Sequence, residues 1–301
     1  MQLPSPIQFG RLLGDAYRGL KNNDPLRMAA ATAFFATFAL SPILIILTQI
    51  LGLILNPKSI SDHLFVHLGE IIGNESVGQL RQTLQGFKHL ASNWYITIAG
   101  FVFLIFVATT LFAIIRDSLN QLWSIKTHSN AAFNIKLLDR LKAVAVIMLA
   151  GLLFLGVVLG EGILALLKDY FHELWPGSTT FLFKILNQII SILIVSSWFA
   201  VIFKYLSDAR LDWNTTMVGA FFTGILFTVG KLVLGYVLAL SNIQTIYGAS
   251  GSFVLLLLFV FYCSFILYYG AMFTRVWAEY RQTSIEPRKN AYKYILSEVK
   301  K

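Results

Sequence analysis

Two charged residues interrupt long apolar runs of the sequence, and they are the first candidates for chemistry. Glu161 lies in GVVLGEGILALL, and Lys231 lies in FTVGKLVLGY. A charge in such a run is costly inside a bilayer, so each is a candidate functional residue. The two could face a shared water-filled cavity along a substrate path. Alternatively, they form a structural ion pair, or each side chain extends to the membrane surface.

The segment 241–252, SNIQTIYGASGS, carries no charge and is rich in Gly, Ser, Asn and Gln. Non-helical backbone at membrane depth must be buried in protein or line water. A partly re-entrant loop that lines a cavity is the favoured interpretation, and a plain external turn is the alternative. The pair Ser41-Pro42 predicts a kink in another apolar helix. The candidate substrate-path residues are therefore Glu161, Lys231, Ser41, Pro42, Asn242, Gln244, Tyr247, Gly248, Ser250 and Gly251.

A third group has the spacing of metal ligands. His63, His67 and Glu70 occur at i, i+4 and i+7, so they share one face of a helix. Leu64 occupies the position at which an HExxH zinc site carries glutamate. Because no fourth ligand is in view, a solvated amphipathic helix face is the favoured interpretation, and no metal or other cofactor is predicted.

The composition identifies the kind of element that must hold these residues. Of the 301 residues, 56% are hydrophobic and 13% are charged, and the mean hydropathy is +0.69. A soluble fold of this size cannot bury so much apolar side chain. The chain is therefore predicted to be a polytopic membrane protein, which excludes disordered and disulfide-rich secreted domains. The one cysteine, Cys263, cannot form an intrachain disulfide.

Six apolar stretches are long enough to cross a bilayer core of about 30 Å as a helix. The predicted fold is thus all-α, with six transmembrane helices and amphipathic helices at the interface. Residues 1–24 are predicted to contain an amphipathic helix on the cytoplasmic face, residues 25–277 the transmembrane domain, and residues 278–301 a basic, partly helical tail. The spans are expected at about 28–55, 94–115, 141–168, 181–203, 215–240 and 251–277.

The distribution of Lys and Arg predicts the orientation. With the helix ends included, four lie in the N-terminal segment, five in the second loop, two in the fourth and seven in the tail together with Arg275, which makes eighteen. The first and third loops hold three and two. The positive-inside rule then places both termini in the cytoplasm. This asymmetry also explains the net charge of +9. Anionic lipid on the cytoplasmic side is the expected partner, nucleic acid is not, and a homo-oligomer is left open.

The predicted cytoplasmic connector 116–140 carries Trp123, a residue suited to a membrane interface. The acids on this side are scattered, and arginines such as Arg116, Arg140 and Arg210 lie next to them in the sequence. Simple pairing with these neighbours is the favoured interpretation. The acids concerned are Asp117, Asp139, Asp208 and Asp212.

Longer patterns extend from about residue 10 to 281. They include DPLRMAAATAFFATFALSPILIIL, SLNQLWSI, FKYLSDARLDW, GAFFTGILFTVGKLVLGYV and IYGASGSFVLLLLFVFYCSFILYYGAMFTRVWAEYR. Together they resemble the YihY/virulence factor BrkB family of bacterial inner-membrane proteins. The resemblance implies six spans and the cytoplasmic membrane, and members were formerly mislabelled ribonuclease BN. Many members carry an acid after the Gly-Ala of the last span, where this sequence has Met272.

Two functions from different classes are compatible with these patterns. The favoured one is transport or translocation of a lipid-like or amphiphilic envelope substrate without ATP hydrolysis, because the sequence has polar candidates in its spans and no P-loop. The alternative is a non-transporting envelope scaffold or lipid-binding membrane protein. A membrane-bound ribonuclease is a remote third, because no cluster of carboxylates or histidines is in view. No enzyme activity is predicted.

Overall fold

The structure is a computed structural model, and the part of the chain that it describes is mostly helical with two small sheets. The residues that it describes are 4–52, 77–78, 81, 94–128, 145, 149, 152–153, 179–240, 251–288 and 291–295.

Five long helices make up most of the described chain. They are α2 (Pro25–Gly52), α5 (Trp94–Leu122), α7 (Thr179–Val201), α8 (Trp213–Leu240) and α10 (Gly251–Tyr280). Each corresponds to a predicted span, and α5 continues furthest beyond its predicted end at residue 115. α7 continues directly into a π-helix, η1 (Ile202–Leu206). The predicted span 141–168 lies almost entirely outside the described residues.

Within the described part of the chain, three segments are long and apolar enough to cross a membrane: Gln188–Leu206, Trp213–Tyr236 and Phe253–Tyr280. A shorter apolar helix covers Pro25–Leu40. The count of six spans stays a prediction. On α8, the large side chains of Phe221, Ile225, Val229 and Leu232 form an exposed apolar stripe. Such a continuous apolar surface favours contact with lipid over contact with water.

The N-terminal helix α1 (Pro6–Lys21) packs across the end of α10. It begins with a capping box, in which the Ser5 hydroxyl accepts from the Gln8 N–H and the Gln8 side chain accepts from the Ser5 N–H. Leu12, Ala16 and Leu20 recur every four residues, and all three are buried. The apolar stripe of this helix therefore faces the protein and not the surroundings.

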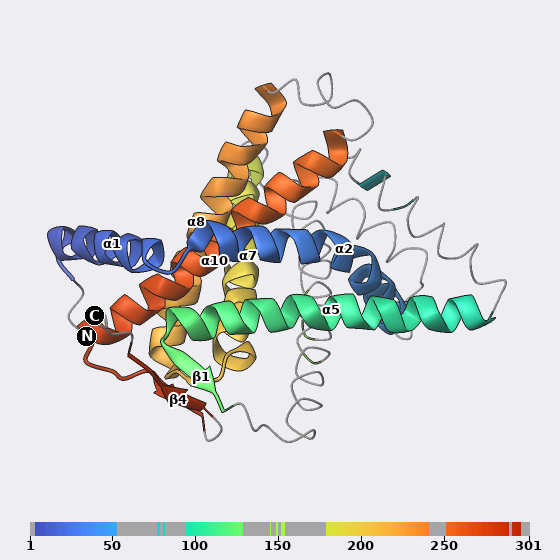
Figure 1. The fold of residues 1–301 in the computed structure, drawn as a ribbon. Helices are drawn as coiled ribbons and strands as arrows, with labels where there is room; N and C mark the ends of the chain where they lie inside the picture. Colours follow the sequence, from blue (N-terminus) through green and yellow to red (C-terminus); the bar gives the residue numbers. More distant parts are fainter. Residues whose placement is uncertain are drawn as a thin grey trace.

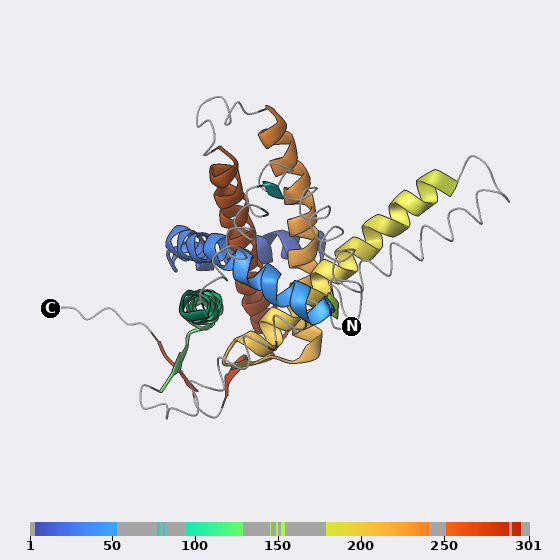
Figure 2. The same cartoon turned by 90° about the vertical axis from the view of Figure 1, so that its right-hand side faces the viewer.

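The helices converge at one end, which we call the junction end. There α5, α7 and α10 finish while α2 and α8 begin. Figure 1 shows α1 and the strands at this end, with the long helices running away from it in different directions. In Figure 2 the yellow N-terminal part of α7 points away from the other helices. Lateral packing joins α2 with α5 and α10, and α8 with α7 and α10.

The chain leaves two helices by residues with left-handed backbone, Ser124 after α5 and Gln282 after α10. Strand β1 (Ile125–Thr127) follows the first, and it pairs antiparallel with β4 (Ala291–Lys293). The second sheet pairs β2 (Ala209–Arg210) with β3 (Glu286–Pro287). The predicted tail, 278–301, thus begins within the last turn of α10, and its described strands β3 and β4 are extended because their backbones pair with two earlier connectors.

Trp123 also differs from its expectation. The sequence places it at a membrane interface, but in the structure it is 1% exposed. Its indole N–H donates to the carbonyl oxygen of Ala271 at 2.9 Å, and its ring lies edge-on to Phe203. Trp123 therefore joins α5 to α10 and η1 in the core of the junction end.

Helices α8 and α10 approach closely because glycine on one meets a polar side chain of the other. A Cβ atom at Gly219 would overlap the Thr274 hydroxyl, and a Cβ atom at Gly270 would overlap the Thr223 hydroxyl. The Tyr262 hydroxyl likewise occupies the space that a Cβ atom at Gly230 would need. These contacts follow the rule that small residues let helices approach in a membrane.

The glycine contacts predict a difference between two sites on one helix. Gly219→Ala forces the α8–α10 contact apart, and overpacking of this kind costs about 1–3 kcal/mol of unfolding free energy. Gly235→Ala is the matched control, because a Cβ atom there meets nothing within 4 Å. Thermal unfolding in detergent should show a lower midpoint for Gly219→Ala and no loss for Gly235→Ala. Equal midpoints would contradict the packing argument.

Candidate functional site

Lys231, the charge that the sequence singles out in the fifth predicted span, lies in α8 and is half-buried. Among the described residues it has no ion-pair partner. Glu161, its expected partner, lies outside the described residues. Whether the two charges meet therefore stays a prediction.

The other path candidates are distributed between described and undescribed segments. Ser41 and Pro42 lie in α2, which Figure 1 shows changing direction in its C-terminal part. Gly251 is buried at the first position of α10. Those outside the described residues are Asn242, Gln244, Tyr247, Gly248 and Ser250, together with the metal candidates His63, His67 and Glu70. Among the described residues no three potential ligands cluster as a metal site.

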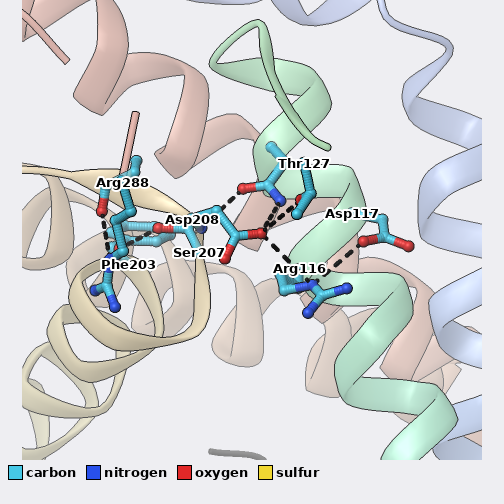
Figure 3. Close-up of polar contacts among 9 residues, drawn as sticks. Arg116, Asp117, Thr127, Phe203, Ser207, Asp208 and Arg288 are labelled. Atoms are coloured by element: carbon cyan, nitrogen blue, oxygen red, sulfur yellow. Dashed lines mark hydrogen bonds and ion pairs between the residues drawn. The ribbon is translucent and has the colours of Figure 1, made fainter. Parts of the chain in front are cut away.

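The structure instead brings together a polar cluster at the junction end, centred on Asp208 (Figure 3). Asp208 is 7% exposed and follows η1. Its Oδ2 accepts from the Asn120 amide at 2.8 Å and from the Thr127 hydroxyl at 3.1 Å. Its backbone N–H donates to Asn120 Oδ1 at 2.9 Å. One residue thereby joins the end of α5, strand β1 and the connector between α7 and α8.

Arg116 provides the positive charge for this cluster. Its Nε lies 3.8 Å from Asp208 Oδ2 and 3.3 Å from Asp117 Oδ1. Figure 3 shows the guanidinium between the two carboxylates. The expectation that Asp117 and Asp208 pair with an arginine is correct for this contact. For Asp208, the sequence neighbour Arg210 is not the partner; an arginine from another helix is.

Arg288, in the tail, connects the π-helix to the strands. Its Nη2 donates to the Lys204 carbonyl at 2.8 Å and its Nε to the Ala209 carbonyl at 3.3 Å. Its backbone N–H donates to the Asp208 carbonyl at 2.9 Å. Helix ends leave carbonyl oxygens without intrahelical partners, and a cation placed there satisfies them. The tail thus caps η1 and extends the Asp208 cluster.

Arg275 makes the corresponding contact at the end of α5. Its Nη1 donates to the Leu122 carbonyl at 2.7 Å and to the Ser124 hydroxyl at 3.0 Å, while its Nε pairs with Glu279 Oε1 at 2.9 Å. Leu122 is the last residue of α5, so the guanidinium lies at the negative end of that helix. α10 is therefore held to α5 by both Arg275 and the Trp123 indole.

Asp212 precedes α8 and caps it. Its Oδ2 accepts from the Thr215 N–H at 3.0 Å. Partial burial alone would raise the pKa of this carboxyl. The hydrogen bonds from Thr215 and the nearby Lys204 charge outweigh burial and hold the pKa below its usual value of 3.8. Lys204 itself donates to the Leu211 carbonyl and lies 5.0 Å from the centre of the Trp213 ring.

The printed contacts of this cluster join the end of α5, strand β1 and the connector between α7 and α8 through Asp208 Oδ2 and its backbone N–H. Such a cluster can position the helix ends relative to one another. Sequence reasoning missed the cluster because Asn120 and Asp208 are 88 positions apart. The signal available was an asparagine and an aspartate in short polar segments, SLNQL and LSDAR, that follow long apolar runs.

Comparison with known proteins supplies the relatives of this chain. A family model described as "Virulence factor BrkB" matches residues 16–294. A UPF0761 membrane protein of Saccharophagus degradans is 24% identical over 280 residues, covering 92% of this chain and 61% of that protein. Another, from Pseudomonas paraeruginosa, is 24% identical over 273 residues, covering 88% and 62%. The chain spans about three fifths of the length of these relatives, and no solved structure matches it.

The Asp208 cluster predicts a large stability effect. Asp208→Ala leaves the Asn120 amide and the Thr127 hydroxyl without this acceptor and removes one of the two carboxylates beside Arg116, which costs about 2–4 kcal/mol of unfolding free energy. Glu286→Ala is the control, because this carboxylate is exposed on the same end of the molecule. Thermal unfolding in detergent should separate the two variants clearly. Similar midpoints would mean that the cluster does not hold the helix ends.

The lowered pKa of Asp212 predicts a pH dependence with a definite sign. A carboxylate whose pKa is lower in the folded state stabilises the fold above its usual value of 3.8, and that stability is lost as the pH falls through the folded-state pKa. At pH 7, Asp212→Asn should therefore melt below the unmodified protein. The gap should shrink as the pH is lowered below about 4. A gap that is independent of pH would contradict the assignment.

Proposed function

From the premise that this chain belongs to the virulence factor BrkB family of membrane proteins, we propose that it translocates a lipid-like or amphiphilic envelope substrate without hydrolysing ATP. The observation that carries the proposal is Lys231. This cation is half-buried in the candidate span Trp213–Tyr236, and no described carboxylate pairs with it. A cation retained in an apolar helix is costly unless something uses it. An anionic or zwitterionic head group that passes through the protein can be its partner.

We further propose that the protein lies in the bacterial cytoplasmic membrane with both termini in the cytoplasm. The alternation of helix directions supports this topology. The connector after α5, the connector between α7 and α8, the tail and α1 all lie at the junction end. These are the segments that the Lys and Arg distribution assigns to the cytoplasm. The β1–β4 and β2–β3 pairings support it, because paired strands lie on the same side of a membrane.

The proposal has no catalytic step. On the proposed cytoplasmic side, Asp208 and Asp212 are engaged in helix positioning and capping. A membrane-bound nuclease would need carboxylates that are open to metal and water. Membrane lipids are accordingly the proposed partners, and nucleic acid is not.

A specific observation also favours the alternative, a lipid-binding scaffold. The junction end is joined by two sheets and by Arg275 and Arg288, so it forms one linked unit. A protein that only binds lipid needs no opening at this end. The two functions differ in whether lipid crosses the bilayer, and that difference can be measured directly.

The test is a translocation assay with purified protein in liposomes that contain fluorescent phospholipids. Lys231→Met should lower the rate about 10- to 100-fold, which corresponds to loss of a charge-assisted contact. Lys231→Arg should retain most of the rate because it keeps the charge. Arg18→Met is the control, since this side chain is 82% exposed on α1.

An unchanged rate in Lys231→Met would remove Lys231 from the mechanism. Absence of translocation by the unmodified protein across several head groups, together with retained lipid binding, would favour the scaffold.

A further inference from the structure

A pocket of about 550 Å³ lies between α1 and the end of α10, separate from the Asp208 cluster. In Figure 1 the two helices lie close to one another at the left of the molecule. The volume of the pocket falls in the range of small-molecule binding sites. The lining residues are Leu12, Asp15, Gly19, Asn22, Asn23, Met272, Arg275, Val276, Glu279 and Tyr280.

Matching helix faces form the two walls. Asp15, Gly19 and Asn22 occur at i, i+4 and i+7 on α1 and its C-cap. Met272, Val276 and Glu279 have the same spacing on α10. Gly19 keeps the space between the walls open, because a Cβ atom there would already lie 3.0 Å from the Met272 sulfur. The pocket therefore depends on this glycine.

The lining has an apolar part and a polar part. Leu12 and Met272 are buried and supply apolar surface. The polar part carries two carboxylates, Asp15 and Glu279, and one guanidinium, Arg275. A pocket with an apolar wall and charges of both signs fits a molecule that is itself amphiphilic and zwitterionic.

The charges in the pocket are only partly engaged with one another. Asp15 lies 3.8 Å from Arg18, with both side chains more than half exposed. Glu279 Oε1 pairs with Arg275 Nε, while Arg275 Nη1 contacts α5. Within the described part of the chain, Glu279 Oε2, Arg275 Nη2 and the Asn22 amide have no further partner. These groups can receive an ammonium and a phosphate.

The charge of the residues that line the pocket differs in sign from the net charge of the chain. The chain has a net charge of +9, yet carboxylates outnumber cations in the pocket. An anionic lipid such as phosphatidylglycerol would place its phosphate near two carboxylates and gain nothing from them. A primary ammonium is stabilised by both carboxylates, because it can donate hydrogen bonds to Asp15 and Glu279. A trimethylated ammonium has no N–H to donate.

The depth of the pocket matches a lipid head group. It lies at the last turns of the candidate span Phe253–Tyr280, where α1 crosses α10. That level is the head-group region for a helix whose apolar part crosses the bilayer core. The ligand can then keep its acyl chains in lipid while its head group enters the pocket.

We propose that the pocket between α1 and α10 binds the head group of an amine-bearing phospholipid, with the ammonium facing Asp15 and Glu279 and the phosphate facing Arg275 and Asn22. The site lies in the leaflet at the junction end. Binding there requires no translocation, so the inference goes beyond the proposed function and fails or succeeds independently of it.

The test measures binding of three lipids to the purified full chain by native mass spectrometry and by titration in detergent. Phosphatidylethanolamine should bind at least about tenfold more tightly than phosphatidylcholine or phosphatidylglycerol. The double variant Asp15→Asn, Glu279→Gln should lose that preference. Gly19→Gln should block the pocket without changing a charge. Glu286→Gln is the matched control, because it removes an exposed carboxylate on the same side.

Equal affinity for the three lipids, or a preference that survives the double variant and Gly19→Gln, would overturn the proposal. Soluble phosphoethanolamine provides the second source of the same chemistry. If it binds as tightly as the lipid, the site takes a free amine phosphate and the lipid assignment is wrong. If it binds much more weakly, the acyl chains contribute and the lipid assignment is supported. Retained lipid preference with no translocation would leave this inference standing and the proposed function rejected.

Discussion

A carboxylate taken out of water must receive hydrogen bonds and a compensating charge from the protein, and at the junction end Asp208 imposes this requirement. Its partners come from α5 and β1 through Asn120, Thr127 and Arg116. Its own backbone is part of the connector that β3 and Arg288 cover. Burying such a group specifies one arrangement of its partners, because any other leaves a charge unsatisfied. Asp208 therefore fixes how the helix ends are joined, on top of the apolar core that buries Trp123 and Phe203 there.

Most of the helical framework follows from the sequence because it depends on local composition. Apolar runs predict α2, α7, α8 and α10 to within a few residues of their observed ends. The C-terminal end of α5 and the path of the tail are harder to predict. Helices often end at a glycine, but here Ser124 and Gln282 adopt the left-handed backbone that glycine favours. Without that signal, the extended segments after both helices could not be read from the sequence.

The residues of the candidate site also fall into those that the sequence predicts and those that only the fold brings together. Lys231 is conspicuous in the sequence because a single charge in an apolar run stands out whatever its contacts are. Asp208 and Arg288 are ordinary charged residues in a connector and a tail, and only the fold brings them together. Trp123 shows the same limit, since a tryptophan near a helix end suits a membrane interface as well as a buried core position. The type of a side chain predicts the free-energy cost of burying it. The partner that offsets this cost comes from a distant part of the chain and is visible only in the fold.

The pairing of β1 with β4 and of β2 with β3 also has a consequence for biosynthesis. Strand β1 leaves the ribosome more than 160 residues before β4, and β2 more than 70 residues before β3. Chains grow at about 5–20 residues per second, so the two earlier strands wait for several seconds with unpaired edges. During that interval α2, α5, α7 and α8 have been synthesised without the tail that joins their ends. The final arrangement of the membrane helices is thus completed late, after synthesis of the tail, and not helix by helix as each one is inserted.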